Sequence, residues 1–398
     1  MTSARETLGA VPSVTVRETA CDDQMRLAIF IPSFGDGGVE RMLVNMVIGL
    51  AARGVDVVFF TGRPDGPHLE KLAGHARIEY FPQSPWPLQV LRLRRELVKH
   101  PVDAVLAAKL NDASVAVTVK RLLGGTPPVI LRPGTAVTER LAGRSRFTRW
   151  RKLGRMRRVY RQADAVVANS QGVRADVARA TGLSPDSIDL VRNPVISPAF
   201  HTLASEPTND TWLAADMPRP PVILGMGGLR RQKDFETLIR AFALVREKRD
   251  CRLLILGEGQ LRHRLESLIQ DLGLSGFARL PGFVENPYPL LAAADLFVLS
   301  SRWEGSPNVL TEALALGTPV VATDCRSGPA EILRNGEVAP LVPVGDVSAM
   351  ATEIEKTLSR RPDPLALKAA TEAYTVEANA AAYHELLISL RPEGDGNA

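Results

Sequence analysis

Short apolar runs alternate with longer amphipathic segments along most of the chain from residue 26 onward. The short runs are rich in Val, Ile, Leu and Ala, which is typical of strands that are buried on both faces of a parallel sheet. The longer segments repeat their apolar positions every three or four residues, as helices do. This alternation predicts an α/β fold in which helices cover both faces of each sheet.

The alternation occurs in two blocks, each long enough for a doubly wound sheet. In the first block strands are predicted at 27–32, 55–60, 77–81, 104–107, 129–132, 165–168 and 188–191, and helices at 39–52, 90–99 and 113–122. In the second block strands are predicted at 222–226, 252–256, 278–280, 296–299 and 319–322, and a helix at 235–248. We therefore expect two Rossmann-like, doubly wound domains that face a central cleft.

The 398 residues exceed the roughly 250 to 300 at which a single core stops growing, which also favours two domains. Prolines concentrate between the two blocks and indicate a linker there. A terminal helical segment, 376–390, needs a surface to cover, and we expect it to cross back to the first domain. The predicted divisions are a tail at 1–24, a first domain at 25–195, a linker at 196–220, a second domain at 221–375, and the returning helix with a tail at 376–398.

The composition is that of a globular protein, with 45% hydrophobic and 23% charged residues. No apolar run approaches the roughly 18 to 20 residues that a membrane-spanning helix needs, and the first 23 residues lack the apolar centre of a secretory signal. The three cysteines are far apart and show no paired metal-binding spacing. These features together lead us to expect a cytoplasmic protein.

Positive charge is concentrated at 140–161, where ten Lys or Arg residues occur without an acid. Such a block predicts an anionic partner, which could be a phospholipid surface, a lipid-linked phosphate or nucleic acid. Trp150, Leu153, Met156 and Tyr160 form an apolar stripe at helical spacing within the block, as membrane-surface helices do. The alternative is that this stripe packs on the first domain while the arginines are solvated.

The segment 300–322 carries the clearest chemistry, because it follows a predicted buried strand and opens a helix. Ser306 is a candidate N-cap, and Pro307 suits the first helical position. The amides of Asn308, Val309 and Leu310 would then be unpaired within the helix. Free amides at a helix N-terminus bind anions, and a diphosphate is a natural occupant.

Two carboxylates, Glu304 and Glu312, bracket this helix start. A carboxylate can accept two hydroxyl groups at once, so the pair fits a sugar diphosphate, with one glutamate binding the hexose and the other the ribose. Separately, each could be an ordinary loop or helix acid. We expect both side chains to face a solvent-lined cleft.

This segment resembles the nucleotide-sugar signature of the retaining glycosyltransferase family 4, the group 1 glycosyltransferases of GT-B fold, with two glutamates eight positions apart. Three further segments match that family in the expected order: a glycine-rich loop at 37–41, a Gly-x-Gly turn at 257–259 and a base-facing segment at 281–287. The resemblance implies that donor contacts are made by Gly37, Gly38, Gly257, Glu258, Phe283, Val284, Ser306, Pro307, Asn308, Val309, Leu310 and Glu312.

Two departures from the family occur. Gly228 stands where the family usually has an Arg that holds the β-phosphate, whereas Lys233 keeps the place of the second cation. Arg230 or Arg231 is the expected substitute, because a guanidinium can reach a phosphate from a neighbouring position. The catalytic group is therefore expected to comprise Glu304, Lys233 and Arg230. The first domain lacks the family's usual His, and Arg132 to Thr135 are expected to border the sugar pocket instead.

The resemblance implies a retaining hexosyltransferase that moves a sugar from a nucleotide diphosphate, a UDP-sugar, to a hydroxyl of a lipid-linked or cell-surface glycan. It would act in the cytoplasm, peripherally on the inner face of the plasma membrane. No cofactor or bound metal is expected, because neither an Asp-x-Asp strand end nor a His/Cys cluster occurs. The alternatives are a sugar-nucleotide epimerase of the same fold and a non-catalytic sugar-nucleotide-binding protein. Nucleic-acid binding lacks a recognised module.

Overall fold

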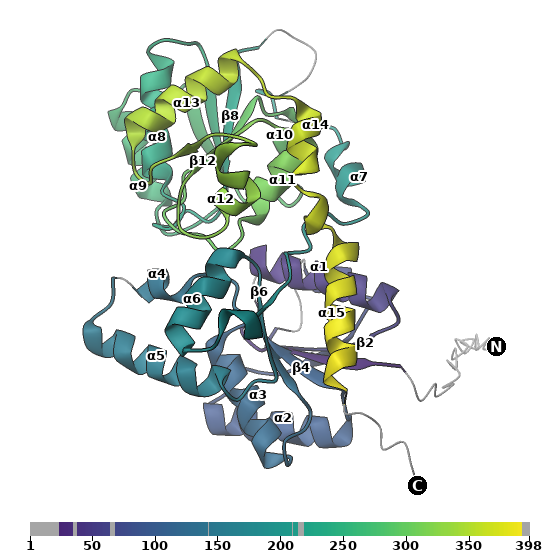
Figure 1. Cartoon of the computed structure of the whole chain (residues 1–398). Helices are drawn as coiled ribbons and strands as arrows, with labels where there is room; N and C mark the ends of the chain where they lie inside the picture. The colour runs from purple at the N-terminus through teal and green to yellow at the C-terminus, as the bar shows by residue number, and fades with distance from the viewer. Residues whose placement is uncertain are drawn as a thin grey trace, which may run out of the picture.

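The computed structural model describes residues 24–34, 38–63, 68–141, 143–208, 210–213 and 219–391. Figure 1 shows two α/β domains, one above the other. The first holds a seven-stranded sheet of order β3-β2-β1-β4-β5-β6-β7, and the second a six-stranded sheet of order β10-β9-β8-β11-β12-β13. All pairings within the two described sheets are parallel. The prediction of two Rossmann-like, doubly wound domains is confirmed.

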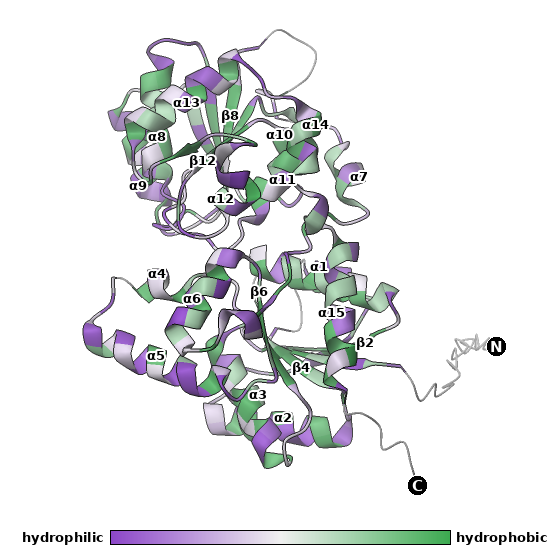
Figure 2. Ribbon diagram, viewed as in Figure 1, coloured by the Kyte–Doolittle hydropathy of each residue, from purple (hydrophilic) through white to green (hydrophobic). Residues whose placement is uncertain are grey.

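The strands are the short apolar runs of the sequence, and Figure 2 shows them as hydrophobic segments inside each domain. The first sheet consists of β1 (Arg26–Ile31), β2 (Asp56–Thr61), β3 (Arg77–Tyr80), β4 (Ala104–Ala107), β5 (Val129–Leu131), β6 (Ala165–Ala168) and β7 (Asp189–Leu190). The second consists of β8 (Val222–Met226), β9 (Arg252–Leu256), β10 (Ala278–Gly282), β11 (Leu296–Leu299), β12 (Val320–Thr323) and β13 (Leu341–Val342). Only β13 was not predicted, because its two residues lie between prolines.

Helices connect most successive strands, and they cover both faces of each sheet because right-handed crossovers run in both directions from the point where the strand order reverses. The first domain has α1 (Gly38–Ala52), α2 (Trp86–Lys99), α3 (Leu110–Leu122), α4 (Val137–Leu141), α5 (Arg146–Tyr160) and α6 (Gln171–Thr181). The second has α8 (Phe235–Arg246), α9 (Arg262–Asp271), α10 (Tyr288–Ala293), α11 (Asn308–Leu316), α12 (Pro329–Ile332), α13 (Val347–Ser359) and α14 (Pro364–Ala369). None of the described helices is long and apolar enough to cross a membrane.

The basic segment 140–161 is mostly α5, which packs on one face of the first sheet together with α2 and α3. Met156 and Tyr160 are 1% and 6% exposed, and Leu153 packs against the same core. Trp150, by contrast, is 72% exposed. Three of the four side chains in the stripe therefore pack in the core that covers the sheet. The interpretation of the stripe as a continuous membrane-facing surface is wrong, and the alternative, packing on the first domain, is correct for these three.

The segment between the domains contains a short helix, α7 (Phe200–Ala204), in a stretch for which the sequence indicated only a linker. Phe200 is fully buried, and its ring lies 4.7 Å from that of Tyr288 at the start of α10. An aromatic pair of this kind adds stability beyond the burial of its surface. This part of the connection is therefore packed on the second domain.

The last helix, α15 (Val376–Leu390), returns from the second domain and lies along α1 of the first (Figure 1). Thr375 begins it by accepting a hydrogen bond from the amide of Ala378. Tyr383 and Leu387 join the core under α1. The close approach occurs at Gly49, where a Cβ atom would lie 2.6 Å from Cγ1 of Val376.

Gly49→Val is expected to lower the free energy of unfolding by about 1 to 3 kcal/mol, because a larger side chain at this helix crossing forces α15 away from α1. Gly154→Val is the matched control, since Gly154 is also helical but has no atom within 4 Å of an added Cβ. Urea denaturation of both variants measures the difference. Equal stabilities for the two variants would show that α15 is not held closely at Gly49.

Candidate functional site

Ligands of open parallel sheets bind beyond the carboxyl ends of the strands, at the point where the strand order reverses. In the second sheet this point lies between β8 and β11, and in the first between β1 and β4. Lys233 lies in the loop after β8, and Glu304 in the loop after β11. Two predicted site residues, 71 positions apart in sequence, therefore share one edge of the sheet.

The side chain of Glu304 is largely buried, and three neighbouring side chains donate hydrogen bonds to its carboxylate. Its Oε1 accepts hydrogen bonds from Lys233 Nζ at 2.7 Å and from Ser301 Oγ at 2.6 Å. Its Oε2 accepts from Gln232 Nε2 at 3.3 Å. A buried carboxylate is stable only when it is paired and hydrogen-bonded, so the ion pair fixes both Lys233 and Glu304 in position.

The loop after β8 depends on two glycines. Gly227 has φ +149°, and a Cβ atom there would lie 2.8 Å from Cε of Lys233, so the lysine stem passes directly over the backbone. At Gly228 the nearest atom to an added Cβ is Nε of Arg230, at 3.4 Å. The Arg230 side chain thus lies in the space beside Gly228. Arg230 and Arg231 are both exposed.

Three loops come together beyond β8, β9 and β10, which are neighbours in the sheet. Gly257, with φ +132°, lies so close to Gly227 that a Cβ atom would overlap the Gly227 carbonyl. Its amide donates to the Gly282 carbonyl at 2.7 Å. The predicted residues that follow, Glu258 and Phe283, are exposed near this junction, and Val284 is partly buried in the core. Arg262 bonds the Glu258 carboxylate and lowers its pKa.

The start of α11 differs from the prediction by one residue. Pro307 is the N-cap with β-region dihedral angles, the helix begins at Asn308, and the helix start has no side-chain cap. Ser306 as N-cap is therefore wrong. The Leu310 amide donates to the Pro307 carbonyl at 3.1 Å, so the prediction that this amide is unpaired is also wrong. The amides of Asn308 and Val309 remain as the candidates for binding an anion.

Glu312 lies in α11 at the boundary between the domains and is only 1% exposed, because Arg41 of α1 covers it. Arg41 forms an ion pair with Glu312 Oε1, and its guanidinium lies 5.5 Å from the ring centre of Tyr288. Glu312 Oε2 has no hydrogen-bond partner among the described atoms. The expectation that Glu304 and Glu312 face a solvent-lined cleft is thus wrong in this structure.

Further contacts join the two domains beside this ion pair. Asn308 Nδ2 donates to the Gly38 carbonyl at 3.2 Å, and Asn193 Nδ2 donates to Asn308 Oδ1 at 2.6 Å. Gly305 lies against Gly134 so closely that a Cβ atom at Gly305 would overlap the Gly134 carbonyl. The described end of the glycine-rich loop, at Gly38, therefore meets the start of α11. Gly37 lies outside the described residues.

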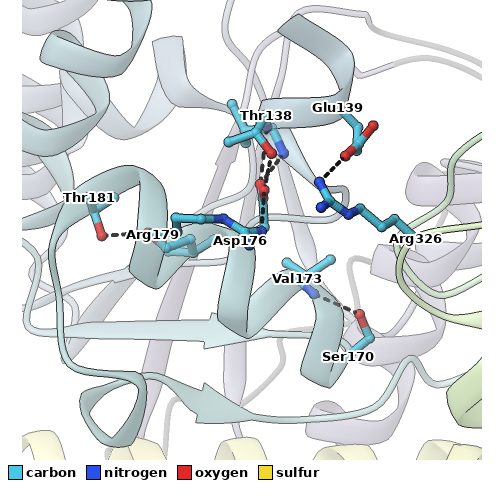
Figure 3. Close-up of polar contacts among 10 residues, drawn as sticks. Thr138, Glu139, Ser170, Val173, Asp176, Arg179, Thr181 and Arg326 are labelled. Atoms are coloured by element: carbon cyan, nitrogen blue, oxygen red, sulfur yellow. Dashed lines mark hydrogen bonds and ion pairs between the residues drawn. The ribbon is translucent and has the colours of Figure 1, made fainter. Parts of the chain in front are cut away.

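A more exposed contact crosses the interface from α4, as Figure 3 shows. Asp176 of α6 accepts hydrogen bonds from the amides of Val137 and Thr138, at 2.6 and 3.1 Å, and so fixes the first turn of α4. The following residue, Glu139, accepts a hydrogen bond from Arg326 Nη1 of the second domain at 2.6 Å. Arg326 is 68% exposed, so this ion pair is in solvent.

In the first domain, the segment 132–135, which was predicted to border the sugar pocket, is partly buried. Arg132 is 2% exposed and donates to Asn193 Oδ1, so it joins the strand ends and does not face an open pocket. Lys109, after β4, donates to the Ser33 carbonyl at 2.5 Å and lies 3.4 Å from Glu40. Burial raises the pKa of the nearby Asp112 to about 7.

The sequence did not single out Arg41, Lys109 or Asp112. Arg41 is the last residue of the predicted glycine-rich loop, 37–41, and that position was the only available signal for it. Lys109 and Asp112 flank the start of a helix, and the contact of Lys109 with Glu40 depends on the pairing of β1 with β4. Among the residues that the structure describes, no group of three or more His, Cys, Asp or Glu could hold a metal ion.

Two family models match the chain, one in each domain. Residues 36–196 match the model described as "Glycosyltransferase Family 4", and residues 220–360 match that described as "Glycosyl transferases group 1". A Campylobacter jejuni protein named N-acetylgalactosamine-N,N'-diacetylbacillosaminyl-diphospho-undecaprenol 4-alpha-N-acetylgalactosaminyltransferase is 27% identical over 82% of this chain and 88% of its own length. The lipopolysaccharide core biosynthesis glycosyltransferase LpsE of Rhizobium meliloti is 28% identical over 81% of this chain and 86% of its own.

Solved structures share the fold. HepE of Anabaena, crystallised with UDP and glucose, has a TM-score of 0.76 at 20% identity and covers 92% of this chain and 100% of its own. Sucrose-phosphate synthase from Thermosynechococcus elongatus has a TM-score of 0.72 at 20% identity, covering 92% and 99%. The architecture is therefore GT-B, as the sequence predicts.

Arg41→Ala is expected to open the two domains. Without its partner, the buried Glu312 carboxylate would be left unpaired, which is strongly unfavourable, and domain separation would return it to water. Small-angle X-ray scattering should then give a larger radius of gyration than for the unmodified protein. Arg326→Ala is the matched control, because an exposed ion pair contributes only about 0 to 1 kcal/mol. An unchanged radius for Arg41→Ala would show that this ion pair does not hold the domains together.

Proposed function

We propose that the chain is a group 1 glycosyltransferase that transfers a sugar from a UDP-sugar to a hydroxyl group of a lipid-linked or cell-surface glycan. The family-model matches of both domains, and relatives that align with most of the chain, support this assignment. The transfer retains the anomeric configuration, as in glycosyltransferase family 4. The observation that carries the proposal is the ion pair of Lys233 with Glu304 at the strand-order reversal of the second sheet, with Arg230 on the same loop as Lys233 and α11 directly after the loop of Glu304.

The departing diphosphate is the group that this site is suited to stabilise. In the reaction the bond between the anomeric carbon and the phosphate oxygen breaks, and the acceptor oxygen bonds to the same carbon. Negative charge then grows on the diphosphate, where Lys233, Arg230 and the amides of Asn308 and Val309 would meet it. Positioned charges of this kind stabilise a transition state most effectively when the site excludes water.

Arg230 takes the part of the missing arginine in this proposal. Its side chain lies beside Gly228, in the space that a longer residue there would use. A guanidinium binds phosphate oxygens through two parallel hydrogen bonds, which a lysine cannot do. Arg231 is exposed on the same loop and would contribute to the donor site at longer range.

Glu304 and Glu312 bind hydroxyl groups of the donor. Glu304 holds Lys233 in place and also accepts from the sugar, while Glu312 accepts from the ribose. The Oε2 of Glu312 has no hydrogen-bond partner but is buried with the rest of the carboxylate beneath Arg41, so a ribose hydroxyl can reach it only if Arg41 moves. Donor binding would therefore compete with Arg41 for this carboxylate. The UDP bound to the structural relative HepE supports a uridine nucleotide.

The acceptor would approach from the first domain, as in other GT-B enzymes. The named Campylobacter jejuni and Rhizobium meliloti relatives support a lipid-linked or lipopolysaccharide acceptor. The acceptor hydroxyl loses its proton to an oxygen of the departing diphosphate, so no histidine is needed. We place the reaction on the cytoplasmic face of the membrane, where a sugar nucleotide and a lipid-linked acceptor can meet.

Lys233→Ala and Arg230→Ala are expected to weaken the binding of UDP much more than that of uridine, because only UDP presents the diphosphate charge. A hydrogen bond to a charged group contributes about 1.5 to 3 kcal/mol, so the loss for UDP should be at least tenfold. Calorimetry with both ligands measures it. Arg231→Ala is the comparison on the same loop, and a larger diphosphate-specific loss there would assign the role to Arg231 instead of Arg230.

Incubation with a panel of sugar nucleotides, with a polyprenyl-diphosphate glycan and a soluble sugar as acceptors, tests the function itself. Mass spectrometry should reveal a glycosylated acceptor, and NMR its retained anomeric configuration. Glu304→Gln should lower kcat/KM by a factor that corresponds to about 2 kcal/mol or more. It should also lower Tm, because it leaves the largely buried Lys233 ammonium without its carboxylate partner. A changed sugar nucleotide without transfer would indicate an epimerase, and UDP binding without any product would indicate a non-catalytic binding protein.

A further inference from the structure

The outer surface of the first domain combines exposed apolar side chains with many cations. Three helices, α2, α3 and α5, cover the same face of the sheet, because residues from all three pack into one core. They are also joined at their outer side, where Ser114 Oγ of α3 accepts from Trp86 Nε1 of α2 at 3.1 Å and from Arg155 Nη2 of α5 at 2.6 Å. Their outward residues therefore form one continuous surface, which we call the three-helix face.

Large apolar side chains are exposed on all three helices, and Leu122 at the end of α3 is 54% exposed. On α2 the exposed fractions are 44% for Trp86, 51% for Leu88 and 60% for Leu91. On α5 they are 64% for Phe147 and 72% for Trp150, and these two rings stack at 6.1 Å. Figure 1 shows that the end of α5 next to α4 extends to the edge of the domain. Each of these side chains leaves 44% or more of its surface exposed.

The same face is strongly cationic. The three helices contain thirteen Lys or Arg residues and only two acids, Glu96 and the buried Asp112. Figure 2 shows much of α5 as hydrophilic. Three of the cations have fixed partners: Arg155 on Asn111 and Ser114, Arg157 on the Ala180 carbonyl, and Lys120 on Asp164. Arg95 and Arg158 are among the exposed cations, and neither side chain has a hydrogen-bonding or ion-pair partner within the described ranges.

A basic hollow on the outer side of α5 completes the surface. It has a volume of about 420 Å³ and is lined by Arg157, Arg158, Arg161, Gly154 and Gln162. Arg158 and Arg161 are exposed beside this open hollow and can donate to the oxygens of a phosphate group, whereas Arg157 is held by the Ala180 carbonyl. The aromatic rings and the hollow lie on one helix, so an apolar contact and an anionic contact occur together.

We propose that the three-helix face docks on an anionic phospholipid bilayer. Leu88, Leu91, Phe147 and Trp150 would enter the boundary between headgroups and acyl chains, while the arginines meet lipid phosphates. Exposed leucines on α2 argue against a nucleic acid as the occupant, because they have no favourable contact with a phosphate backbone. The sequence analysis predicted membrane contact only for the basic segment 140–161, and the structure adds α2 to the proposed docking surface. The side of α5 that carries Met156 and Tyr160 is buried in the core and takes no part in docking.

The three-helix face also adjoins the edge of the first sheet that faces the second domain, where a lipid-linked acceptor would enter. In a doubly wound sheet each helix begins at the carboxyl edge of its preceding strand, so Trp86 and the start of α3 lie at the edge that faces the second domain. Docking would therefore bring the edge of the candidate site next to the lipid surface. This part rests on the proposed function, whereas bilayer binding itself does not.

Co-sedimentation of the full-length chain with vesicles, in the absence of donor and acceptor, tests the docking. Phosphatidylcholine vesicles with and without phosphatidylglycerol are compared at low and high salt. The protein should co-sediment with the anionic vesicles at low salt and remain in the supernatant at high salt, because salt screens interactions between exposed charges. Failure to bind anionic vesicles at low salt would overturn the proposal, whatever the outcome of the transferase assay.

Three sets of variants locate the contact. Arg95→Gln, Arg151→Gln and Arg158→Gln together should weaken binding about 100-fold, at about fivefold for each cation. Leu88→Ser with Leu91→Ser, and separately Phe147→Ser with Trp150→Ser, should weaken it at unchanged charge. The matched controls lie on the second domain: Arg240→Gln, Arg360→Gln and Lys368→Gln together, and Leu365→Ser, a side chain that is 73% exposed.

The controls should bind as the unmodified protein does, and all variants should keep its circular dichroism spectrum. Equal losses in the charge control would show that net charge, and not this face, determines binding. Undiminished vesicle binding by both apolar variants, together with equally tight binding of a duplex oligonucleotide, would identify a general polyanion surface and contradict membrane docking. Arg155 is left unchanged in every variant because it holds α5 to α3.

Discussion

Two buried carboxylates of the second domain, Glu304 and Glu312, each require a cationic partner, and the two partners come from different domains. Glu304 finds Lys233 within its own domain, from the next loop of the same sheet edge. Glu312 finds Arg41 across the interface, from the first helix of the other domain. Because an unpaired buried charge is costly, the first pair fixes the candidate site and the second couples its end to the position of the first domain.

Close approach of the backbone allows both pairs to form. Gly227 lies under the Lys233 stem, and Gly257 packs against Gly227, so the loops after β8 and β9 meet without side chains between them. Gly305 lies against Gly134 in the same way at the domain interface. A side chain at any of these positions would separate the loops that carry the charged residues. The glycines thus explain how cations and carboxylates from distant segments reach one edge.

Hydrophobic periodicity was enough to predict the two sheets, since a buried parallel strand such as Val222–Met226 is a continuous apolar run. It could not predict β13, whose two residues have no periodicity, or α7, which depends on the packing of Phe200 against Tyr288. The motifs around Lys233 and Glu304 indicated residues that the fold does bring together. Sequence could not indicate that Arg41 covers Glu312, because that pair spans 271 positions and depends on how two domains meet. The N-cap was misplaced by one residue because Pro307 takes the extended conformation that Ser306 was expected to have.

The central claim is that the edge containing Lys233, Glu304 and the start of α11 holds the diphosphate of a sugar nucleotide. A crystal structure of the protein with UDP tests this most directly. The account predicts phosphate oxygens within hydrogen-bonding distance of Lys233 Nζ and of the Asn308 and Val309 amides, with a ribose hydroxyl on Glu312 and Arg41 displaced from its Oε1. A diphosphate bound elsewhere, with the pairs Lys233–Glu304 and Arg41–Glu312 both intact and free of ligand, would contradict it.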